Sequence, residues 1–413
     1  MGDARNETLY AYEVFGARDL AQRCLWLAAH SLDRLPMVGS QVPSAWEQIL
    51  PAWSFLWTVA VWDYAWQTGS KGELRRLFPW VERNLAGALA RLDAASGLFR
   101  APAWNMFDWA GIDDRHEIVL HNSFLMVGAL QAARRCARLL GETVREEEWR
   151  RAERRLVRAV RMQWDPQREC FPDALDAQGR PVAGASVHTS FLVLLYDAVP
   201  RGARSALVRH TVHGAPGLTS VGSPFALQFC FEALERIKAD DVIIARIRQE
   251  YAGMLAAGAT TVWETFPGST CSPPGFPTRS HCHAWSAAPI TFLHRIVLGV
   301  RARTAGGRAY EVSPRPCGLT WAEGTVATPR GPLDVRWRIE GATLAVALKA
   351  PTGVAVRVAR NEHCAGLGNI EGKPWTAAQR LTPSLGGSDR TGLNEITGSH
   401  NKSARGSSAR HSG

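Results

Sequence analysis

The 413-residue sequence contains no uncharged apolar run of membrane length, and no basic segment followed by an apolar one near Met1. A spanning helix needs about 20 apolar residues, and a secretory leader has a charged and then an apolar region. We therefore expect no membrane partner. The eight cysteines form no CxxC pair and are widely spaced apart from Cys271 and Cys282. This predicts reduced thiols and a cytoplasmic protein.

Common metal-ligand spacings are also missing. Cys271, His281, Cys282 and His283 could in principle form a zinc site, but the ten-residue, proline-rich gap between the cysteines matches no common ligand spacing. We expect no metal ion, and no cofactor is indicated.

An excess of acidic residues is lacking too, since 48 Lys and Arg against 38 Asp and Glu give a net charge of +10. A positive charge can indicate nucleic-acid binding. Here the arginines are interleaved with glutamates along predicted helices, as in residues 134–155, and no zinc-finger or RNA-binding signature accompanies them. The pattern is typical of a solvated, salt-bridged helix surface. No nucleic-acid partner is therefore expected.

Strand patterns are almost absent before Ala309, where apolar residues recur at helical spacing in segments joined alternately by tight turns and long loops. The predicted helices comprise one within 1–32, then 50–68, 74–93, 117–140, 145–164, 187–198, 205–212, 224–238, 241–257 and 287–300. About ten or eleven helices suit an (α/α)6 six-hairpin toroid that lacks its first helix or two. A helical solenoid is disfavoured because the segments share no sequence period. The long loops should gather at one end of the toroid, where pockets are usually built.

From Ala309 the pattern changes to short, alternating, β-branched segments separated by turns. The predicted strands are 317–322, 325–327, 333–339, 343–348 and 354–358. They indicate a small C-terminal antiparallel β-sandwich. From about Ala365 the sequence is rich in Gly, Ser and Arg with almost nothing to bury, which is typical of disorder. We therefore predict a mainly α protein with a toroid over 1–304, a partial β-sandwich over 305–364 and a disordered tail over 365–413.

The stretch from 258 to 301 is the most informative. A β-branched run leads to Glu264, which follows a tryptophan, and a Pro-, Gly- and Ser-rich loop separates it from His281 and His283. With no Lys or Arg nearby in the loop, this carboxylate is expected to be partly desolvated. Desolvation raises a carboxyl pKa and suits the group to proton transfer. A surface or helix-end carboxylate is equally compatible with these residues alone.

Two segments of this stretch, TTVWE and SHCHAWSAAP, resemble a two-part motif of the α-L-rhamnosidases, glycoside hydrolase family 78. The resemblance extends more diffusely from Met1 to about Ala359. It implies hydrolysis of terminal α-L-rhamnosyl residues from glycosides or oligosaccharides by an inverting mechanism. In such enzymes one carboxylic acid protonates the leaving oxygen, and a carboxylate on the opposite face of the sugar activates water. The resemblance assigns the general base to Glu264 and a sugar contact to His283.

The N-terminal segment MGDARNETLYAYEVFG resembles the second half of a longer motif of the same family. The resemblance assigns Asp3 to the sugar hydroxyls, with Arg5 and Asn6 matching the residues that follow. The family's general acid is a glutamate ahead of this segment, so we expect it just upstream of Met1. The sequence as given is then expected to be nearly inactive toward natural rhamnosides. An inactive sugar-binding remnant or gene fragment is one alternative, and another six-hairpin glycosidase is a second.

Sixteen tryptophans is a high number for a chain of this length. Most are expected in the core, but aromatic side chains near a carboxylate pocket also stack on the apolar faces of sugars. The segment FDW resembles a family loop and assigns Asp108 and Trp109 to substrate binding. Trp53 is a further candidate for stacking, and Trp57 competes with it. His188 matches a family His-Thr pair but is equally compatible with a capping or core role, and it is not assigned to the site.

Overall fold

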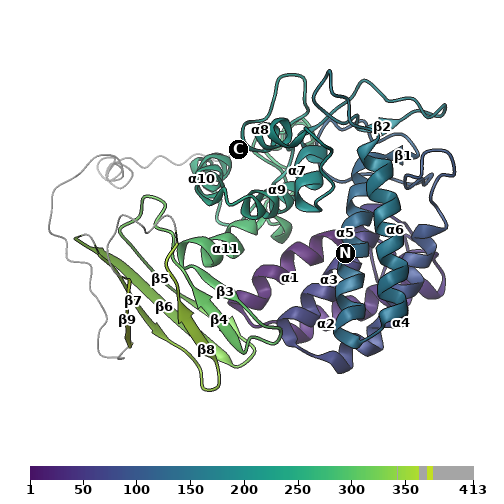
Figure 1. Cartoon of the computed structure of the whole chain (residues 1–413). Coiled ribbons are helices and arrows are strands. Elements are labelled where there is room, and N and C mark those ends of the chain that lie inside the picture. The colour runs from purple at the N-terminus through teal and green to yellow at the C-terminus, as the bar shows by residue number, and fades with distance from the viewer. Residues whose placement is uncertain (342, 362–369, 375–413) are drawn as a thin grey trace, which may run out of the picture. The chain divides into compact units, whose positions relative to one another are not determined.

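The computed structural model describes residues 1–341, 343–361 and 370–374. Helices dominate up to Val297 and strands from Val300 onward (Figure 1), as the change in periodicity predicts. Most helix bounds agree closely with the predicted segments. At the N-terminus the GDARN segment is itself the first turn of a helix, and a second helix follows it. The predicted helix 287–300 is wrong in its length, because the α-helix there covers only Ala288–Phe292, a π-helical turn follows, and Val300 begins a strand.

The α-helices follow one another in pairs. They are α1 (Gly2–Val14), α2 (Arg18–His30), α3 (Pro51–Thr68), α4 (Lys71–Leu89), α5 (Leu120–Leu140), α6 (Thr143–Arg161), α7 (Val187–Leu195), α8 (Arg204–His213), α9 (Pro224–Arg236), α10 (Asp240–Ala256) and α11 (Ala288–Phe292). Short 3-10 turns η1 (Ser31–Asp33) and η2 (Ala284–Ser286) and a π-helical turn η3 (Leu293–Val297) complete the set.

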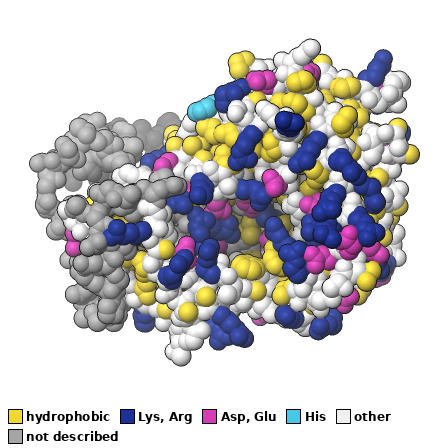
Figure 2. Space-filling model, viewed as in Figure 1, with side chains coloured by type: hydrophobic (Ala, Val, Ile, Leu, Met, Phe, Trp, Pro, Cys, Tyr) yellow, Lys and Arg dark blue, Asp and Glu magenta, His cyan; other side chains and the backbone are white. Residues whose placement is uncertain are grey.

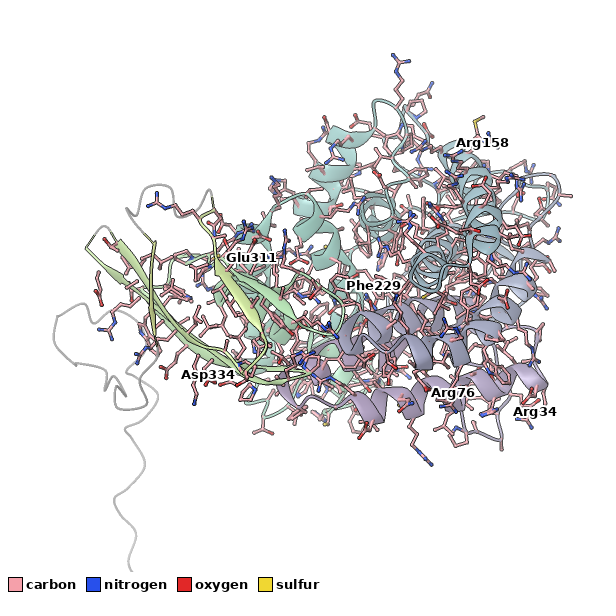
Figure 3. The ribbon with its side chains drawn as sticks, turned by 60° about the horizontal axis from the view of Figure 1, so that its bottom comes forward. Arg34, Arg76, Arg158, Phe229, Glu311 and Asp334 are labelled. Atoms are coloured by element: carbon pink, nitrogen blue, oxygen red, sulfur yellow. The ribbon has the colours of Figure 1, made fainter. Side chains whose placement is uncertain are left out.

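The odd-numbered helices form an inner ring, and the even-numbered helices pack outside it. Helices α3, α5, α7 and α9 are buried on most sides, whereas α6 buries a single apolar stripe at helical spacing. Each inner helix packs against the next, and α11 packs back against α1, which closes the ring. Phe229 of α9 lies among these helices (Figure 3). The predicted (α/α)6 toroid is confirmed, with five complete hairpins and α11 leading through η3 into strands in the part of the chain described.

The long loops of the ring lie at one end. Each inner helix passes to its outer partner through a short connection, for example at Gly69 and Gly141, whose positive φ of 67° and 84° ends α3 and α5. The chain then returns along the outer helix and reaches the next inner helix through a longer connection, such as 90–119, 162–186 and 257–287. The N-terminal ends of the inner helices therefore share one end with these loops, as predicted.

The strands form two sheets after the ring, and a short pair within it. One sheet has the order β3 (Val300–Ala302), β4 (Ala309–Val312), β8 (Ala355–Val358). The other has the order β5 (Trp321–Thr328), β6 (Gly331–Glu340), β7 (Thr343–Lys349), β9 (Ile370–Pro374). Strands β1 (Ile118–Val119) and β2 (Ala174–Leu175) pair between two of the long loops.

This β domain differs from the prediction in four respects. Strand β5 merges part of the segment 317–322 with 325–327, because its ladder with β6 continues through Gly324. Strands β3 and β4 are formed by cross-strand pairing rather than by strong β propensity, so strands already begin at Val300. The pairs β4–β8 and β7–β9 are parallel, not antiparallel, because β8 and β9 each join a sheet beside a strand that is not their neighbour in the chain. Strand β9 also occupies part of the predicted tail, whose remainder, 365–369 and 375–413, lies outside the described residues.

Hydrogen bonds and close backbone contacts attach the β domain to the ring. Trp337 of β6 is fully buried and donates its indole N–H to the carbonyl oxygen of Val297, at 2.7 Å. Gly306 donates its backbone N–H to the carbonyl of Trp66, at 2.8 Å. A Cβ on Gly69 would stand 2.9 Å from the Gly306 Cα, so both this contact and the positive φ require glycine at Gly69.

Charged side chains lie on the outside and pair with one another. Figure 2 shows Lys and Arg spread over one face with Asp and Glu between them, and Figure 3 places Arg34 and Arg76 at the periphery of the helical domain. Arg138 of α5 and Glu146 of α6 form one such pair, at 2.5 Å. This supports the prediction of a salt-bridged helix surface.

Within the described ranges, no helix is long and apolar enough to span a membrane. The cysteines in those ranges are free thiols, as predicted.

The start of α5 holds the long loop that precedes it. His121 is fully buried, and its Nε2 lies 2.8 Å from the backbone oxygen of Asn105, so this nitrogen carries the proton. Asn122 donates to the Asn105 Oδ1 at 2.8 Å, while the Asn105 amide donates to the carbonyls of Ala101 and His116. The loop 101–116 is thereby fixed from its buried side.

This arrangement predicts acid sensitivity. Burial, assisted by the neighbouring His188, lowers the pKa of His121 to about 3, from 6.5 for an ordinary histidine. The neutral side chain stabilises the fold above pH 6.5, and the contribution is lost as the pH falls toward 3, because the unfolded chain takes up the proton first. We expect His121 alone to lower the free energy of unfolding by about 2 kcal/mol between pH 7 and pH 5, measured with urea.

His121→Gln should be less stable at pH 7 but should depend less on pH, because its amide can still donate to Asn105 without titrating. His30→Gln, at an exposed position of α2, is the control and should keep the wild-type slope. An unchanged slope in His121→Gln would show that another group dominates the acid response.

Candidate functional site

Glu264 lies on the connection between α10 and α11, at the loop end of the ring. The two halves of the motif run side by side there, because Glu264 N–H donates to the Ser280 carbonyl and His283 N–H to the Val262 carbonyl, both at 2.9 Å. Thr265 N–H donates to the Thr278 hydroxyl at 3.1 Å. This pairing fixes Glu264 and His283 relative to each other.

Two side chains hold the Glu264 carboxylate. The Trp109 indole N–H donates to Oε1 at 2.9 Å, and the Arg279 Nε lies 3.2 Å from the same oxygen. Oε2 receives no hydrogen bond from any residue described, and the side chain is 15% exposed. One oxygen is therefore fixed, and the other is available to a water or a substrate.

Arg279 corrects the expectation that Glu264 has no cation near it. The arginine stands 15 residues later in the chain, and the pairing of the two loop segments brings it back to the carboxylate. Its guanidinium also lies 3.9 Å from the centre of the Trp109 ring, a close cation–π contact. Glu264, Trp109 and Arg279 thus hold one another in a triangle. The one sequence feature that indicated a place for Arg279 in the site is its position directly before the SHCHAW segment.

A second group forms around Asp3, at the start of α1. Its Oδ2 accepts a hydrogen bond from the Trp53 indole at 3.0 Å, and its Oδ1 lies 4.0 Å from the His283 Nε2. The His283 ring stacks on Trp285, with centroids 4.3 Å apart, and the Trp285 indole donates to the Glu264 carbonyl at 3.1 Å. Trp285, which was not predicted as a site residue, therefore joins the Asp3 group to the Glu264 group.

The two tryptophans that compete for stacking have different surroundings. Trp57 is fully buried and donates to the Leu25 carbonyl at 3.1 Å, which makes it a core residue. Trp53 is 5% exposed and stacks on Phe225, with centroids 5.3 Å apart. A Cβ on Gly2 would lie 2.6 Å from the Trp53 ring, so this indole fills the space beneath the first turn of α1. Trp53 is the tryptophan beside Asp3, and its contact with a sugar stays a prediction.

Asp108 lies next to Trp109 in the chain but is oriented into the protein. Its side chain is fully buried and accepts hydrogen bonds from Gly222 N–H at 2.8 Å, the Ser223 hydroxyl at 2.5 Å and His188 Nε2 at 2.8 Å. These three donors lie at the starts of α7 and α9. Asp108 thus fixes the loop that presents Trp109, and its contact with substrate stays a prediction.

Comparison with known proteins gives the family. Residues 1–297 match the bacterial alpha-L-rhamnosidase 6 hairpin glycosidase domain, and residues 299–369 match the bacterial alpha-L-rhamnosidase C-terminal domain. The chain is similar to a GH78 family rhamnosidase of Bacillus sp. GL1, with 34% identity and a TM-score of 0.85 over 90% of this chain and 39% of that one. No curated protein matches the sequence.

Two further structures share the fold. A rhamnosidase from Klebsiella oxytoca with rhamnose bound has 23% identity and a TM-score of 0.61, over 71% of this chain and 57% of that one. The Streptomyces avermitilis alpha-L-rhamnosidase complexed with L-rhamnose has 18% identity and a TM-score of 0.69, over 86% of this chain and 34% of that one. The chain thus spans less than two thirds of the length of these three proteins.

The surroundings of Asp108 predict a large effect on stability. Asp108→Asn places an amide donor among three donors that now share a carboxylate, and we expect it to lower the free energy of unfolding by about 2–4 kcal/mol. Asp3→Asn is the matched control, because Asp3 is 36% exposed and asparagine keeps an acceptor for Trp53. It should change stability by less than about 1 kcal/mol. A stable Asp108→Asn protein that has lost sugar affinity would instead place Asp108 in contact with substrate.

Proposed function

Because this chain belongs to the bacterial α-L-rhamnosidase family of six-hairpin glycosidases, we propose that it hydrolyses terminal α-L-rhamnosyl residues of glycosides with inversion. Glu264 is the general base. The observation that carries the proposal is the Glu264 carboxylate, held at Oε1 by Trp109 and Arg279 with Oε2 available. The rhamnose bound in two of the similar structures supports the choice of sugar.

In this mechanism Oε2 takes a proton from a water molecule as the water oxygen attacks the anomeric carbon. The bond from that carbon to the leaving oxygen breaks on the opposite face, and the leaving oxygen takes a proton from a general acid. One water is consumed, and free rhamnose and an alcohol are formed. Two carboxyl groups in such a pair stand about 6.5–9.5 Å apart, which leaves room for the water.

The other site residues bind the sugar. Asp3 and His283 lie beside each other and offer an acceptor and a donor to ring hydroxyls. Trp109 offers to the apolar side of the ring the indole face that Arg279 does not cover, with Trp53 and Asp108 as further assigned contacts. Their present hydrogen bonds suggest that Trp53 acts mainly by orienting Asp3, and Asp108 by orienting Trp109.

The assignment of the general acid comes only from the resemblance. In the family this acid is a glutamate in the first half of the motif whose second half contains Asp3. Leaving groups that are weak bases need little help from an acid. The hydrolysis of nitrophenyl rhamnosides therefore depends on the base alone. A protein without the acid should lose almost all activity toward natural rhamnosides.

Glu264→Gln should lower the turnover of a nitrophenyl α-L-rhamnoside by about two to four orders of magnitude, because the amide cannot accept the water proton. Nitrophenol release measures the rate, in the chain as given and in a longer chain that carries the preceding motif half. Proton NMR of the fresh product should show the inverted anomer first.

Glu340→Gln, at an exposed position of β6, serves as the control and should be close to wild type. Near-normal turnover of Glu264→Gln would remove this residue from the role of base. A retained anomer would replace the inverting mechanism with one that forms a covalent intermediate.

Trp109→Ala and His283→Ala should each weaken rhamnose binding by about fivefold, because each removes one contact worth about 1 kcal/mol. Both residues stand in loops, so circular dichroism should still show a cooperative melt. Calorimetric titration with rhamnose measures the affinity. Unchanged affinity in Trp109→Ala would leave Trp109 with a packing role only.

A further inference from the structure

Two more tryptophans continue outward from Trp109. The Trp104 ring lies 6.4 Å from the Trp109 ring, and the Trp46 ring lies 6.4 Å from Trp104 with an interplanar angle of 30°. Trp46 is 57% exposed and Trp104 is 39% exposed. Large apolar side chains exposed next to one another are unusual in a folded protein and often indicate a binding surface.

We propose that Trp104 and Trp46 form the subsite for the leaving-group side of the glycoside. The proposal rests on the proposed function, in which the terminal sugar lies against Glu264 and Trp109. Trp104 is the next ring in the row after Trp109, so it is placed to contact the moiety attached to that sugar. An indole face fits any ligand with a flat apolar face, either a second sugar ring or a planar phenolic ring.

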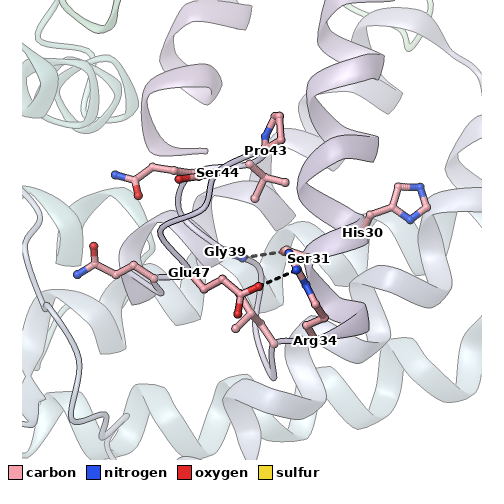
Figure 4. Close-up of a pocket in the computed structure, with 11 residues that line it drawn as sticks. His30, Ser31, Arg34, Gly39, Pro43, Ser44 and Glu47 are labelled. Carbon is pink, nitrogen blue, oxygen red and sulfur yellow. Dashed lines mark hydrogen bonds and ion pairs between the residues drawn. The ribbon is translucent and has the colours of Figure 1, made fainter.

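The loop that carries Trp46 is held in place. Ser40 and Gln48 close it through a backbone hydrogen bond of 2.9 Å, and Arg34 pairs with Glu47 at 2.8 Å (Figure 4). Gly39 N–H donates to the Ser31 hydroxyl at 2.8 Å, which ties the start of the loop to η1. A fixed loop loses little conformational entropy when a ligand binds, so Trp46 is preorganised for stacking.

The loop that carries Trp104 is equally fixed, through the Asn105 contacts to His121 and Asn122. Beside Trp104 a cavity of about 520 Å³ lies between the two loops. Its walls include Ile49, Pro51 and Pro102, and Glu47, Gln48 and Arg91 supply polar groups. An apolar wall with a few polar groups is typical of a site for a small organic ligand.

The test compares ligands that share the terminal sugar. In a Glu264→Gln background, which slows turnover, calorimetry measures the affinity for rhamnose, for a rhamnosyl disaccharide and for a phenolic rhamnoside. Trp104→Ala and Trp46→Ala should each lower the affinity for one or both of the larger ligands by about threefold to tenfold. The affinity for rhamnose should stay unchanged. Trp104→Phe should restore most of the affinity, since it keeps a stacking face. If only the disaccharide binds more weakly, the leaving group is a sugar. If only the phenolic rhamnoside binds more weakly, the leaving group is a phenol.

Trp321→Ala is the matched control, because Trp321 is also an exposed tryptophan, at 54%, but lies on β5. Equal losses for rhamnose and for the larger ligands would overturn the subsite, since they would indicate a general disturbance of the pocket. Unchanged affinity for all three ligands would also overturn it while leaving the proposed function intact. If rhamnose itself does not bind, the proposed function fails, and this inference fails with it.

Discussion

The packing of α11 against α1 is the contact on which the site depends. These helices stand at opposite ends of the helical sequence, and their contact closes the ring. Closure brings the Glu264–His283 loop, which enters α11, next to Asp3 in the first turn of α1. Without it, the carboxylate assigned to water activation and the carboxylate assigned to the hydroxyls would belong to separate surfaces. The remaining long loops lie at the same end, because each long connection leads from an outer helix to the start of the next inner helix.

The loops at that end are fixed by buried polar side chains more than by apolar packing. Asp108 and His188 join the Trp109 loop to the starts of α7 and α9, while His121 and Asn122 hold the Trp104 loop through Asn105. Each of these hydrogen bonds offsets the cost of burying its donor and acceptor, so together they favour one arrangement of the loops.

The carboxylate at the centre has a cationic neighbour that also packs on its tryptophan. The Arg279 guanidinium forms a hydrogen bond with Glu264 and packs on the Trp109 ring, so the proposed base, its indole donor and the cation are in mutual contact. Trp109 in turn contacts Trp104, which extends the same unit toward the outer subsite. A substitution at Trp46 or Trp104 should therefore affect ligand binding, whereas a substitution at Glu264 should affect the chemistry.

The sequence by itself determined the helical hairpins, the change to strands and the identity of Glu264, Trp109 and His283 as candidates, because these follow from local periodicity and from short motifs. It could not place Arg279, because a loop of undefined path separates this arginine from Glu264 and only the pairing of the two segments brings them together. It could not distinguish Trp53 from Trp57 either, since both stand on the same helix and differ only in what packs against them. The inward orientation of Asp108, the parallel pairing of β8 and β9, and the row formed by Trp46, Trp104 and Trp109 were likewise decided by tertiary structure. Each depends on contacts between segments far apart in the chain, which no local pattern encodes.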